Sequence, residues 1–319
     1  MDLTDYLKEP KSLFLKSITR PALWRRQLVM FLGFTDGLIS FRDFLILLMP
    51  VKLVPSKMKV LPRYYEFLEQ RSKLELARYV SQDGSVKLFG RPFKASYHAI
   101  LALAESVIFE DQYHAKQALR DDSVIIDAGA NVGIFSVFAN SIAQRGHVYA
   151  FEPVKSTFSV LQKNASNYPA ITCVHAGLGN SVAVKNVLDM GYANNGMLSG
   201  TSVIEDSSLY DSSGAERAIN SMMGNLEPAQ ITTIDAFVSD NDIPRVDFIK
   251  IDTEGYESRI LSGASATINK YRPRIAMSAY HNREDVDELP RLLKGIYPDY
   301  TCELHQDNEE DLICYVKPA

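Results

Sequence analysis

The chain has 319 residues, of which 46% are hydrophobic, so it can bury a full core as one large domain or as a domain with an extension. Its net charge is only −5 at pH 7, and it contains no block of Lys and Arg of the kind that a nucleic-acid-binding surface needs. Cys173, Cys302 and Cys314 lack the spacing of metal ligands, and we expect reduced thiols in a cytoplasmic protein.

Residues 1–84 are predicted to form a mainly helical N-terminal extension of a domain that spans residues 85–319. The first twenty residues are broken up by polar and charged side chains and do not predict a signal peptide. The apolar stretch within residues 21–54 is interrupted by charges, whereas a membrane span needs about 20 mostly uncharged residues. We predict two short amphipathic helices, 21–34 and 40–48, that pack on the core or on a second copy of the chain. The alternative is contact with a membrane surface, which the flanking basic residues would assist.

Between residues 86 and 118 the pattern predicts a small β-hairpin followed by helix. The run Val86–Ala95 reads as two short strands, and we expect the turn at Gly90-Arg91. Residues 99–108 carry apolar side chains at helical spacing, and residues 111–118 lead on to the first strand of the core.

From residue 124 to the end, strand and helix patterns alternate. The predicted strands are 124–127, 148–151, 171–175, 246–251, 275–278, 300–304 and 312–316. The predicted helices are 134–143, 155–167, 256–260, 263–270 and 286–294. This alternation predicts an α/β fold with a mostly parallel, seven-stranded sheet covered on both faces. The last two strands are joined by an acidic turn and predict an antiparallel pair at one edge.

Residues 181–230 interrupt this alternation with the turn-rich run Gly191-Tyr-Ala-Asn-Asn-Gly196 and the Ser/Asp-rich run 207–214. A long irregular insertion in a compact domain is usually functional or mobile. This one follows the third strand and should lie near the carboxyl ends of the strands, where α/β proteins bind ligands. We therefore predict a lid or substrate loop, with Asn194 and Asn195 over the substrate. The alternative is a disordered decoration.

A strand, a tight turn and a helix meet at Asp127-Ala-Gly-Ala-Asn-Val-Gly133, which is typical of a nucleotide-type α/β unit. We predict that Gly129 and Gly133 let the backbone approach a ligand, because β-carbons there would block it. The helix beginning at Ile134 presents free N–H groups that suit an anion such as an amino-acid carboxylate. Asp127, at the end of the strand, is placed to receive an ammonium group directly or through water.

A second acidic residue, Glu152, ends the next predicted strand and can accept two hydrogen bonds from ribose hydroxyls. A carboxylate, an ammonium and a ribose together describe S-adenosylmethionine, and we predict this cofactor. The predicted cofactor-binding residues are Asp127, Gly129, Asn131, Gly133 and Glu152. NAD is the rival ligand. Its G-x-G-x-x-G fingerprint has a glycine where this chain has Asn131, whose side chain would crowd a pyrophosphate.

The run Val246-Asp-Phe-Ile-Lys-Ile-Asp-Thr-Glu-Gly-Tyr-Glu-Ser258 places three carboxylates at the end of a predicted strand. Because clustered carboxylates are costly unless used, we assign Asp252 and Glu254 to a substrate site, where they would orient a hydroxyl or hold a divalent cation such as Mg²⁺. Glu257 is interpreted as an acid that only complements the helix dipole. His281 directly follows a predicted strand and is our candidate general base, with an ordinary surface histidine as the alternative.

In order and spacing, these motifs resemble the FkbM family of S-adenosylmethionine-dependent methyltransferases over about residues 95–319. The pieces that carry the resemblance are Asp127-Ala-Gly-Ala-Asn-Val-Gly133, Phe151-Glu-Pro153, Thr233-Ile-Asp235, Lys250-Ile-Asp-Thr-Glu-Gly-Tyr-Glu257 and Tyr280-His281. The resemblance implies a class I methyltransferase fold and, usually, methylation of a hydroxyl oxygen on a sugar, polyketide or other natural product. The antiparallel edge of the predicted sheet also favours a methyltransferase over a dehydrogenase. We recognise no family feature in the first eighty residues.

The sequence therefore predicts methyl transfer from S-adenosylmethionine to a hydroxyl of a sugar, lipid or other small molecule or glycan. Asp252, Glu254 and His281 are predicted to face the transfer site, with His281 taking up the proton. An NAD-dependent oxidoreductase and a non-catalytic scaffold of the same fold are the alternatives, and N-methylation also stays open. The clustered acids argue against the scaffold, since a site free of chemistry has no need of them. The acceptor, any metal requirement and the oligomeric state are not specified by the sequence.

Overall fold

The computed structural model describes most of the C-terminal part of the chain. The chain divides into two compact units, Met1–Val80 and Ser81–Ala319, and every described residue belongs to the second. The described residues are 86–94, 104–109, 111–189, 203–204, 225–282, 284–305 and 311–317. The predictions for residues 1–84, for the segment 21–54 and for Asn194 and Asn195 lie outside them. The boundary expected after residue 84 stays a prediction.

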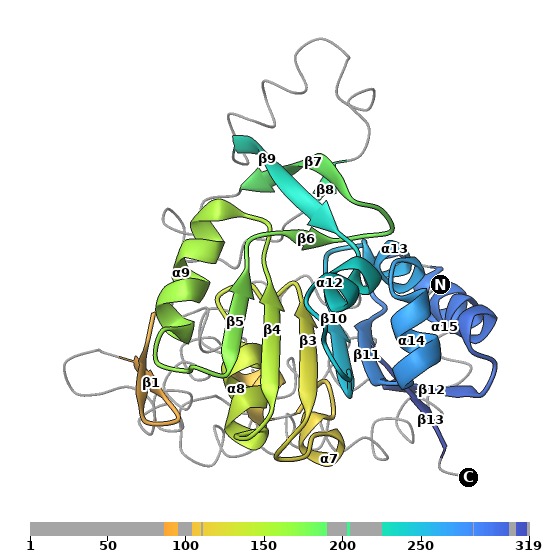
Figure 1. The fold of residues 1–319 in the computed structure, drawn as a ribbon, viewed down its shortest axis with the longest axis horizontal. Helices are drawn as coiled ribbons and strands as arrows, with labels where there is room; N and C mark the ends of the chain where they lie inside the picture. Colours follow the sequence, from red (N-terminus) through yellow and green to blue (C-terminus); the bar gives the residue numbers. More distant parts are fainter. Residues whose placement is uncertain are drawn as a thin grey trace, which may run out of the picture. The chain divides into compact units, whose positions relative to one another are not determined.

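A seven-stranded sheet forms the centre of this unit, with the strand order β12-β13-β11-β10-β3-β4-β5 (Figure 1). Its strands are β3 (Val124–Ala128), β4 (His147–Phe151), β5 (Ile171–Val174), β10 (Phe248–Ile251), β11 (Arg274–Ser278), β12 (Tyr300–His305) and β13 (Asp311–Val316). The five strands from β11 to β5 are parallel, and β13 runs antiparallel to both β11 and β12. The predicted α/β fold, with a mostly parallel sheet of seven strands and an antiparallel edge, is confirmed.

The central strands form because their side chains are buried on both faces of the sheet. Every residue of β10 is buried, and so is every residue of β3 after the first. Parallel strands covered on both sides need this near-continuous burial. The core around them includes Ile126, Phe151, Ile249 and Met277.

Helices cover both faces of the sheet (Figure 1). They are a π-helical segment (Ala104–Phe109), α7 (Ala115–Ala118), α8 (Ile134–Ile142), α9 (Lys155–Ala165), α12 (Ile234–Asp240), α13 (Glu257–Ser262), α14 (Ser265–Tyr271) and α15 (Asp285–Ile296). The five helices predicted between residues 134 and 294 are present with shifted ends. Helix α12 was not predicted; it begins after Thr233, whose hydroxyl oxygen accepts the N–H of Ala236 at 2.9 Å and so caps the helix.

A second, four-stranded sheet corrects the prediction that residues 181–230 are irregular throughout. Its strands, in the order β6-β9-β7-β8, are β6 (Gly177–Leu178), β9 (Asn225–Thr232), β7 (Ala183–Asp189) and β8 (Val203–Ile204). Figure 1 shows this sheet beyond the carboxyl ends of β3, β4 and β5. The insertion therefore starts and ends as paired strands that stand beside the expected ligand site.

The weak sequence signal of this second sheet has a structural cause. On β7, Val184 is 60% exposed, while Val187 is fully buried against Val154 and Ala229 in a small separate core. A strand that buries so little apolar surface lacks the clean alternation from which strands are recognised. Pro228 within β9 further weakens the pattern, because proline is uncommon inside sheets.

Two of the three cysteines are not the reduced thiols that we expected. Cys302 on β12 and Cys314 on β13 lie directly opposite each other, with their Cα atoms 4.1 Å apart, and form a disulfide. Cys173 is free. The separation of twelve residues did not reveal the pairing, because it follows from the register of the hairpin rather than from a recognisable spacing.

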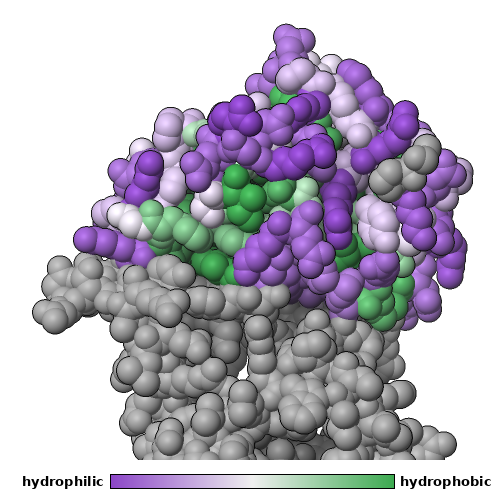
Figure 2. Space-filling view, turned by 90° about the horizontal axis from the view of Figure 1, so that it is seen from below, coloured by the Kyte–Doolittle hydropathy of each residue, from purple (hydrophilic) through white to green (hydrophobic). Residues whose placement is uncertain are grey.

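The surface of the described part is mostly polar in the view of Figure 2, where hydrophobic residues gather in a smaller central area. The large hydrophobic side chains exposed on the described part are Phe89, Val182, Val184, Tyr280 and Leu304. Among the described helices, none is both long enough and apolar enough to span a bilayer.

The predicted hairpin is present as β1 (Val86–Leu88) and β2 (Arg91–Phe93), but its turn is Phe89-Gly90 rather than Gly90-Arg91. Both turn residues have positive φ, 49° and 78°, as a two-residue hairpin turn prefers. Buried Asn164 on α9 ties this hairpin to the core. Its side chain accepts the N–H of Lys94 at 2.6 Å and donates to the carbonyls of Lys94 and Val132, both at 2.8 Å.

Replacing Asn164 with Ala should lower the free energy of unfolding by about 2–4 kcal/mol, because one buried and two partly buried hydrogen bonds to the backbone are lost. Urea denaturation measures this loss. Asn167→Ala, at an exposed position just beyond the same helix, is the matched control and should change stability by less than about 0.5 kcal/mol. Equal effects of the two substitutions would contradict the proposed tie.

Candidate functional site

A pocket opens where β3, β4 and β10 end, at the carboxyl edge of the sheet. Five of the predicted site residues line it: Gly129, Asn131, Glu152, Asp252 and Glu254. Parallel α/β sheets bind ligands at this edge, next to the point where the strand order reverses, which here lies between β3 and β10. The other three predicted residues, Asp127, Gly133 and His281, are not among the residues that line the pocket.

Glu152 lies at the tip of β4 and is 3% exposed. Its Oε1 accepts the N–H of Val154 at 2.9 Å, and its Oε2 accepts the N–H of Asn131 at 3.0 Å. Burial raises the pKa of this carboxyl to about 7, although the two backbone N–H groups act in the opposite direction. Each oxygen keeps a free lone pair, so the group can still receive two hydroxyl donors from a ligand in the pocket.

Contacts within the protein give a structural reason for the two glycines, while their predicted role in letting a ligand approach the backbone stays a prediction. At Gly129 (φ +75°), a β-carbon would stand 2.1 Å from the carbonyl oxygen of Asp252. At Gly133 (φ +93°), it would stand 2.7 Å from a methyl carbon of Leu161. The turn therefore closes tightly on the end of β10 and on α9, and this packing fixes the floor of the pocket.

Asp127 is fully buried and already has a cationic partner within the chain. Its Oδ2 accepts the hydroxyl of Ser136 at 2.6 Å, and its Oδ1 lies 3.2 Å from Nζ of Lys250. The ammonium group that we expected from a ligand is thus matched here by a lysine of β10. Contact between Asp127 and a ligand stays a prediction, and the observed geometry does not favour it.

Lys250 is a site residue that our sequence reasoning missed. Its side chain is 4% exposed, and its Nζ donates to the carbonyl oxygens of Ala128 at 3.2 Å and Gly129 at 2.7 Å. These bonds and the Asp127 contact use all three N–H groups of the ammonium. The signal was a charged residue in the middle of an otherwise apolar buried strand, a position that a lysine occupies only when it is paired.

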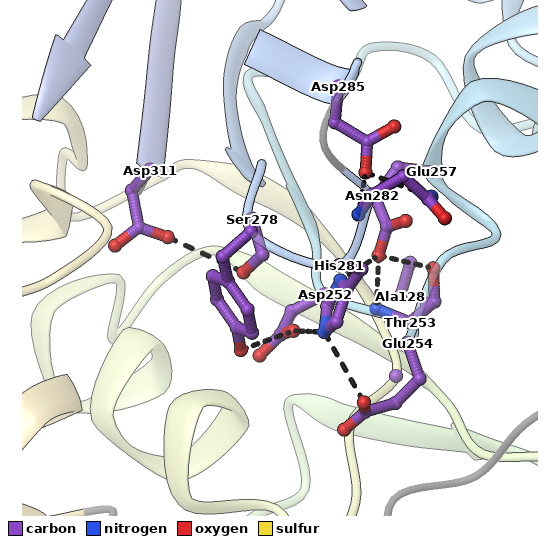
Figure 3. Close-up of polar contacts among 12 residues, drawn as sticks. Ala128, Asp252, Thr253, Glu254, Glu257, Ser278, His281, Asn282, Asp285 and Asp311 are labelled. Atoms are coloured by element: carbon purple, nitrogen blue, oxygen red, sulfur yellow. Dashed lines mark hydrogen bonds and ion pairs between the residues drawn. The ribbon is translucent and has the colours of Figure 1, made fainter. Parts of the chain in front are cut away.

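The predicted acids and histidine come together after β10 (Figure 3). Nε2 of His281 lies 3.3 Å from Oε2 of Glu254 and 3.8 Å from Oδ1 of Asp252. Glu254 has a left-handed φ of 58°, followed by Gly255 at 99°. A non-glycine residue held in this region is strained, and such strain is often found at functional sites.

Glu257 also belongs to this cluster, so the interpretation that it only complements the helix dipole is wrong. The side chain is 1% exposed, and Oε1 lies 3.0 Å from Nδ1 of His281. The same oxygen accepts the N–H of Thr253 at 2.9 Å and its hydroxyl at 3.2 Å. The position in the first turn of α13 is compatible with both roles, and only the fold shows that the side chain points inward.

The three acids control the charge of His281. Burial lowers the pKa of the ring, but Glu254, Glu257 and Asp252 outweigh it and raise the pKa to about 10. The ring therefore carries a proton at neutral pH and cannot accept another in this arrangement. Its role as general base stays a prediction, to which this geometry is unfavourable.

Two tyrosines hold Asp252 in place, and neither was predicted from spacing. The hydroxyl of Tyr113, which precedes α7, donates to Oδ2 of Asp252 at 2.7 Å, and that of Tyr280 donates to Oδ1 at a longer 3.4 Å. Burial and the neighbouring Asp252 carboxylate raise the pKa of Tyr113, so it stays a donor. Asp252 is therefore a fixed acceptor at the pocket wall.

Replacing Lys250 with Met should lower the free energy of unfolding by about 3–5 kcal/mol, because it leaves the Asp127 carboxylate buried without its partner. Urea denaturation measures the loss, and Lys163→Met, exposed on α9, serves as the matched control. The double variant Asp127→Asn/Lys250→Met should recover part of the loss. Strictly additive effects would show that the two side chains are not coupled.

Three known proteins are similar to parts of this chain. Methyltransferase sdnD from Sordaria araneosa is 28% identical over 193 residues, which cover 53% of this chain and 73% of that protein. AMB antimetabolite synthetase AmbE from Pseudomonas aeruginosa is 26% identical over 200 residues, covering 56% of this chain and 9% of that protein. The crystal structure of methyltransferase FkbM from Methylobacillus flagellatus aligns with a TM-score of 0.44 and 20% identity, covering 78% of this chain and 59% of that one. The chain thus spans less than two thirds of the length of AmbE and of the Methylobacillus flagellatus methyltransferase.

The family comparison covers the whole candidate site. The sequence model of the methyltransferase FkbM domain matches residues 127–304, which is more than half of the chain and runs from the end of β3 to β12. It includes the glycine turn, Glu152 and the acids around His281. The chain therefore belongs to the FkbM family of methyltransferases and has their Rossmann-like class I fold.

Proposed function

We propose that this methyltransferase takes its methyl group from S-adenosylmethionine and transfers it to a hydroxyl oxygen of a sugar, lipid or other natural product. The observation that carries the proposal is the pocket at the carboxyl edge of the sheet. Buried Glu152 stands on one side of this pocket, and Asp252 and Glu254 stand on the other. One side suits a ribose and the other an acceptor, which is the division that a two-substrate transfer needs.

The cofactor side of the pocket fits S-adenosylmethionine better than NAD. Glu152 keeps two lone pairs for ribose hydroxyls, and Oδ1 of Asn131 is buried without a hydrogen-bond partner beside it. A ligand that brings hydrogen-bond donors would satisfy both groups. Asn131 also stands where a dinucleotide-binding turn has glycine, and its side chain there opposes a pyrophosphate.

On the acceptor side, the chain supplies orientation and a proton acceptor. Asp252 is held by Tyr113 and can fix an acceptor hydroxyl at the pocket wall. Glu254 also lines the pocket and its side chain is 44% exposed, so its carboxylate can reach the same hydroxyl. We assign proton uptake to Glu254, because both ring nitrogens of His281 face carboxylates rather than the pocket.

The proposed methyl transfer is a single displacement at the methyl carbon, in which one bond forms as another breaks. The acceptor oxygen forms a bond to the methyl carbon as the carbon–sulfur bond breaks, and its proton passes to the carboxylate of Glu254. S-adenosylhomocysteine and the methyl ether are the products. A base positioned for this step contributes about 10²–10⁴-fold to the rate.

Calorimetric titration with S-adenosylmethionine and S-adenosylhomocysteine tests the cofactor, with NAD as the negative control. Ribose hydroxyls donate to the ionised form of Glu152, whose pKa of about 7 means that it must lose a proton on binding at lower pH. The affinity for S-adenosylhomocysteine should therefore rise with pH up to about 7, by at most tenfold per unit, and level off above it.

Glu152→Gln should weaken binding near and above pH 7 and remove this slope, since the amide does not ionise. Glu227→Gln, on β9, is the control and should keep the slope of the parent protein. Tight NAD binding with no response to either sulfur ligand would reject the proposed cofactor.

Glu254→Gln should reduce kcat for a hydroxylated acceptor by about 10²–10⁴-fold while leaving the affinity for S-adenosylhomocysteine unchanged. The amide keeps the size and the hydrogen-bonding oxygen of the side chain but cannot take the proton. Transfer of a labelled methyl group to sugar and lipid acceptors measures the rate. A variant that turns over at the parent rate would remove Glu254 from the mechanism.

A further inference from the structure

We propose that Asp252, Glu257 and His281 bind a divalent transition-metal cation beside the acceptor side of the pocket. This inference rests on the proposed function for its role, but not for its geometry. One oxygen of each acid and one ring nitrogen of the histidine all lie within 4.8 Å of one another. A cation with bonds of about 2.0–2.2 Å would draw three such atoms together by small side-chain movements.

A buried carboxylate oxygen without a hydrogen-bond partner points to a ligand at this cluster. The side chain of Glu257 is 1% exposed, and its Oε2 has no hydrogen-bond partner. The ring nitrogens of His281, whose side chain is 9% exposed, face only carboxylates of this cluster, with Nδ1 3.0 Å from Glu257 and Nε2 3.3 Å from Glu254. Buried polar atoms are nearly always satisfied in folded proteins, so Oε2 of Glu257 needs a partner that the described residues do not supply.

The charge of the cluster favours a dication. The carboxylates of Asp252, Glu254 and Glu257 all have an oxygen within 3.8 Å of the imidazole ring. Like charges this close are costly in a partly buried site unless a counter-charge offsets them. The imidazolium of His281 supplies one positive charge among three negative ones, whereas a divalent cation that displaces a proton from the ring would supply two.

The surroundings hold the candidate ligands in position. The N–H and hydroxyl of Thr253 both bond to Oε1 of Glu257, which leaves Oε2 free. The hydroxyl of Tyr113 bonds to Oδ2 of Asp252, so Oδ1 faces the histidine. Metal sites in proteins typically orient their ligands through such outer hydrogen bonds.

The donor set indicates which cation would bind. One imidazole nitrogen and two carboxylate oxygens suit Mn²⁺, Fe²⁺ or Zn²⁺, whereas Mg²⁺ and Ca²⁺ prefer oxygen ligands alone. Because Asp252 also lines the pocket, the cation would stand where an acceptor hydroxyl can reach it. There it would act as a Lewis acid that makes this hydroxyl easier to deprotonate, with Glu254 taking the proton.

The test is metal binding to the full chain, independent of turnover. After treatment with EDTA, the protein is titrated with Mn²⁺, Zn²⁺ and Mg²⁺ by calorimetry and with Co²⁺ by visible absorption. We expect one equivalent of Mn²⁺, Zn²⁺ or Co²⁺ to bind and Mg²⁺ to bind more weakly. Glu257→Gln should weaken the binding at least a hundredfold, since it removes a charged ligand while its amide oxygen can still accept from Thr253.

Two further variants make the result decisive. Asp252→Asn tests a second ligand if Glu257→Gln does not fold, and circular dichroism checks folding in each case. Glu284→Gln, an exposed acid next to α15, is the matched control and should bind as the parent protein does. Absence of binding in the parent, or equal binding in all variants, would overturn the proposal.

The metal site and the proposed function can fail separately. The EDTA-treated protein is also titrated with S-adenosylhomocysteine. If S-adenosylhomocysteine binds but none of the metal ions does, only the metal site is rejected. If a metal ion binds but S-adenosylhomocysteine does not, the proposed cofactor is rejected and the proposed cation site is retained.

Discussion

The candidate site depends on one buried ion pair, that between Lys250 and Asp127. The ammonium group of Lys250 joins the end of β3 to β10 through the Asp127 carboxylate and through the carbonyls of Ala128 and Gly129. Gly129 has no β-carbon, so its backbone can close against the carbonyl of Asp252. The glycine turn and the acidic segment after β10 are therefore one rigid unit, and neither can shift without moving the other.

This coupling gives the two sides of the pocket different electrostatic characters. On the β4 side, burial dominates the environment of Glu152 and raises its pKa to about 7, against the smaller opposing effects of two backbone N–H groups and Lys250. On the β10 side, Asp252, Glu254 and Glu257 surround a single imidazole ring. Two acidic regions with different environments can do different work, because the surroundings decide which of them holds a proton.

The main sheet and much of the site were predictable from the sequence because they depend on local patterns. Apolar runs that end in an acid or a glycine turn mark β3, β4 and β10, and Glu152, Asp252 and Glu254 lie at their ends as expected. The roles of Lys250 and Glu257 were not predictable, since each depends on a partner that is distant in sequence or reached only by the direction of a side chain. The second sheet was missed because β7 and β9 bury too little apolar surface to show a period.

The proposed transfer makes the counter-charge at His281 a kinetic matter as well as a structural one. The sulfonium of the cofactor loses its positive charge as the methyl group leaves, so an uncompensated group of carboxylates would stabilise the reactants more than the transition state. A positive charge held among Asp252, Glu254 and Glu257 reduces this effect, whether it is the imidazolium or a bound cation. It also favours the negative charge that develops on the acceptor oxygen. Carboxylates whose charge is offset by a cation are therefore better suited to methyl transfer than carboxylates alone.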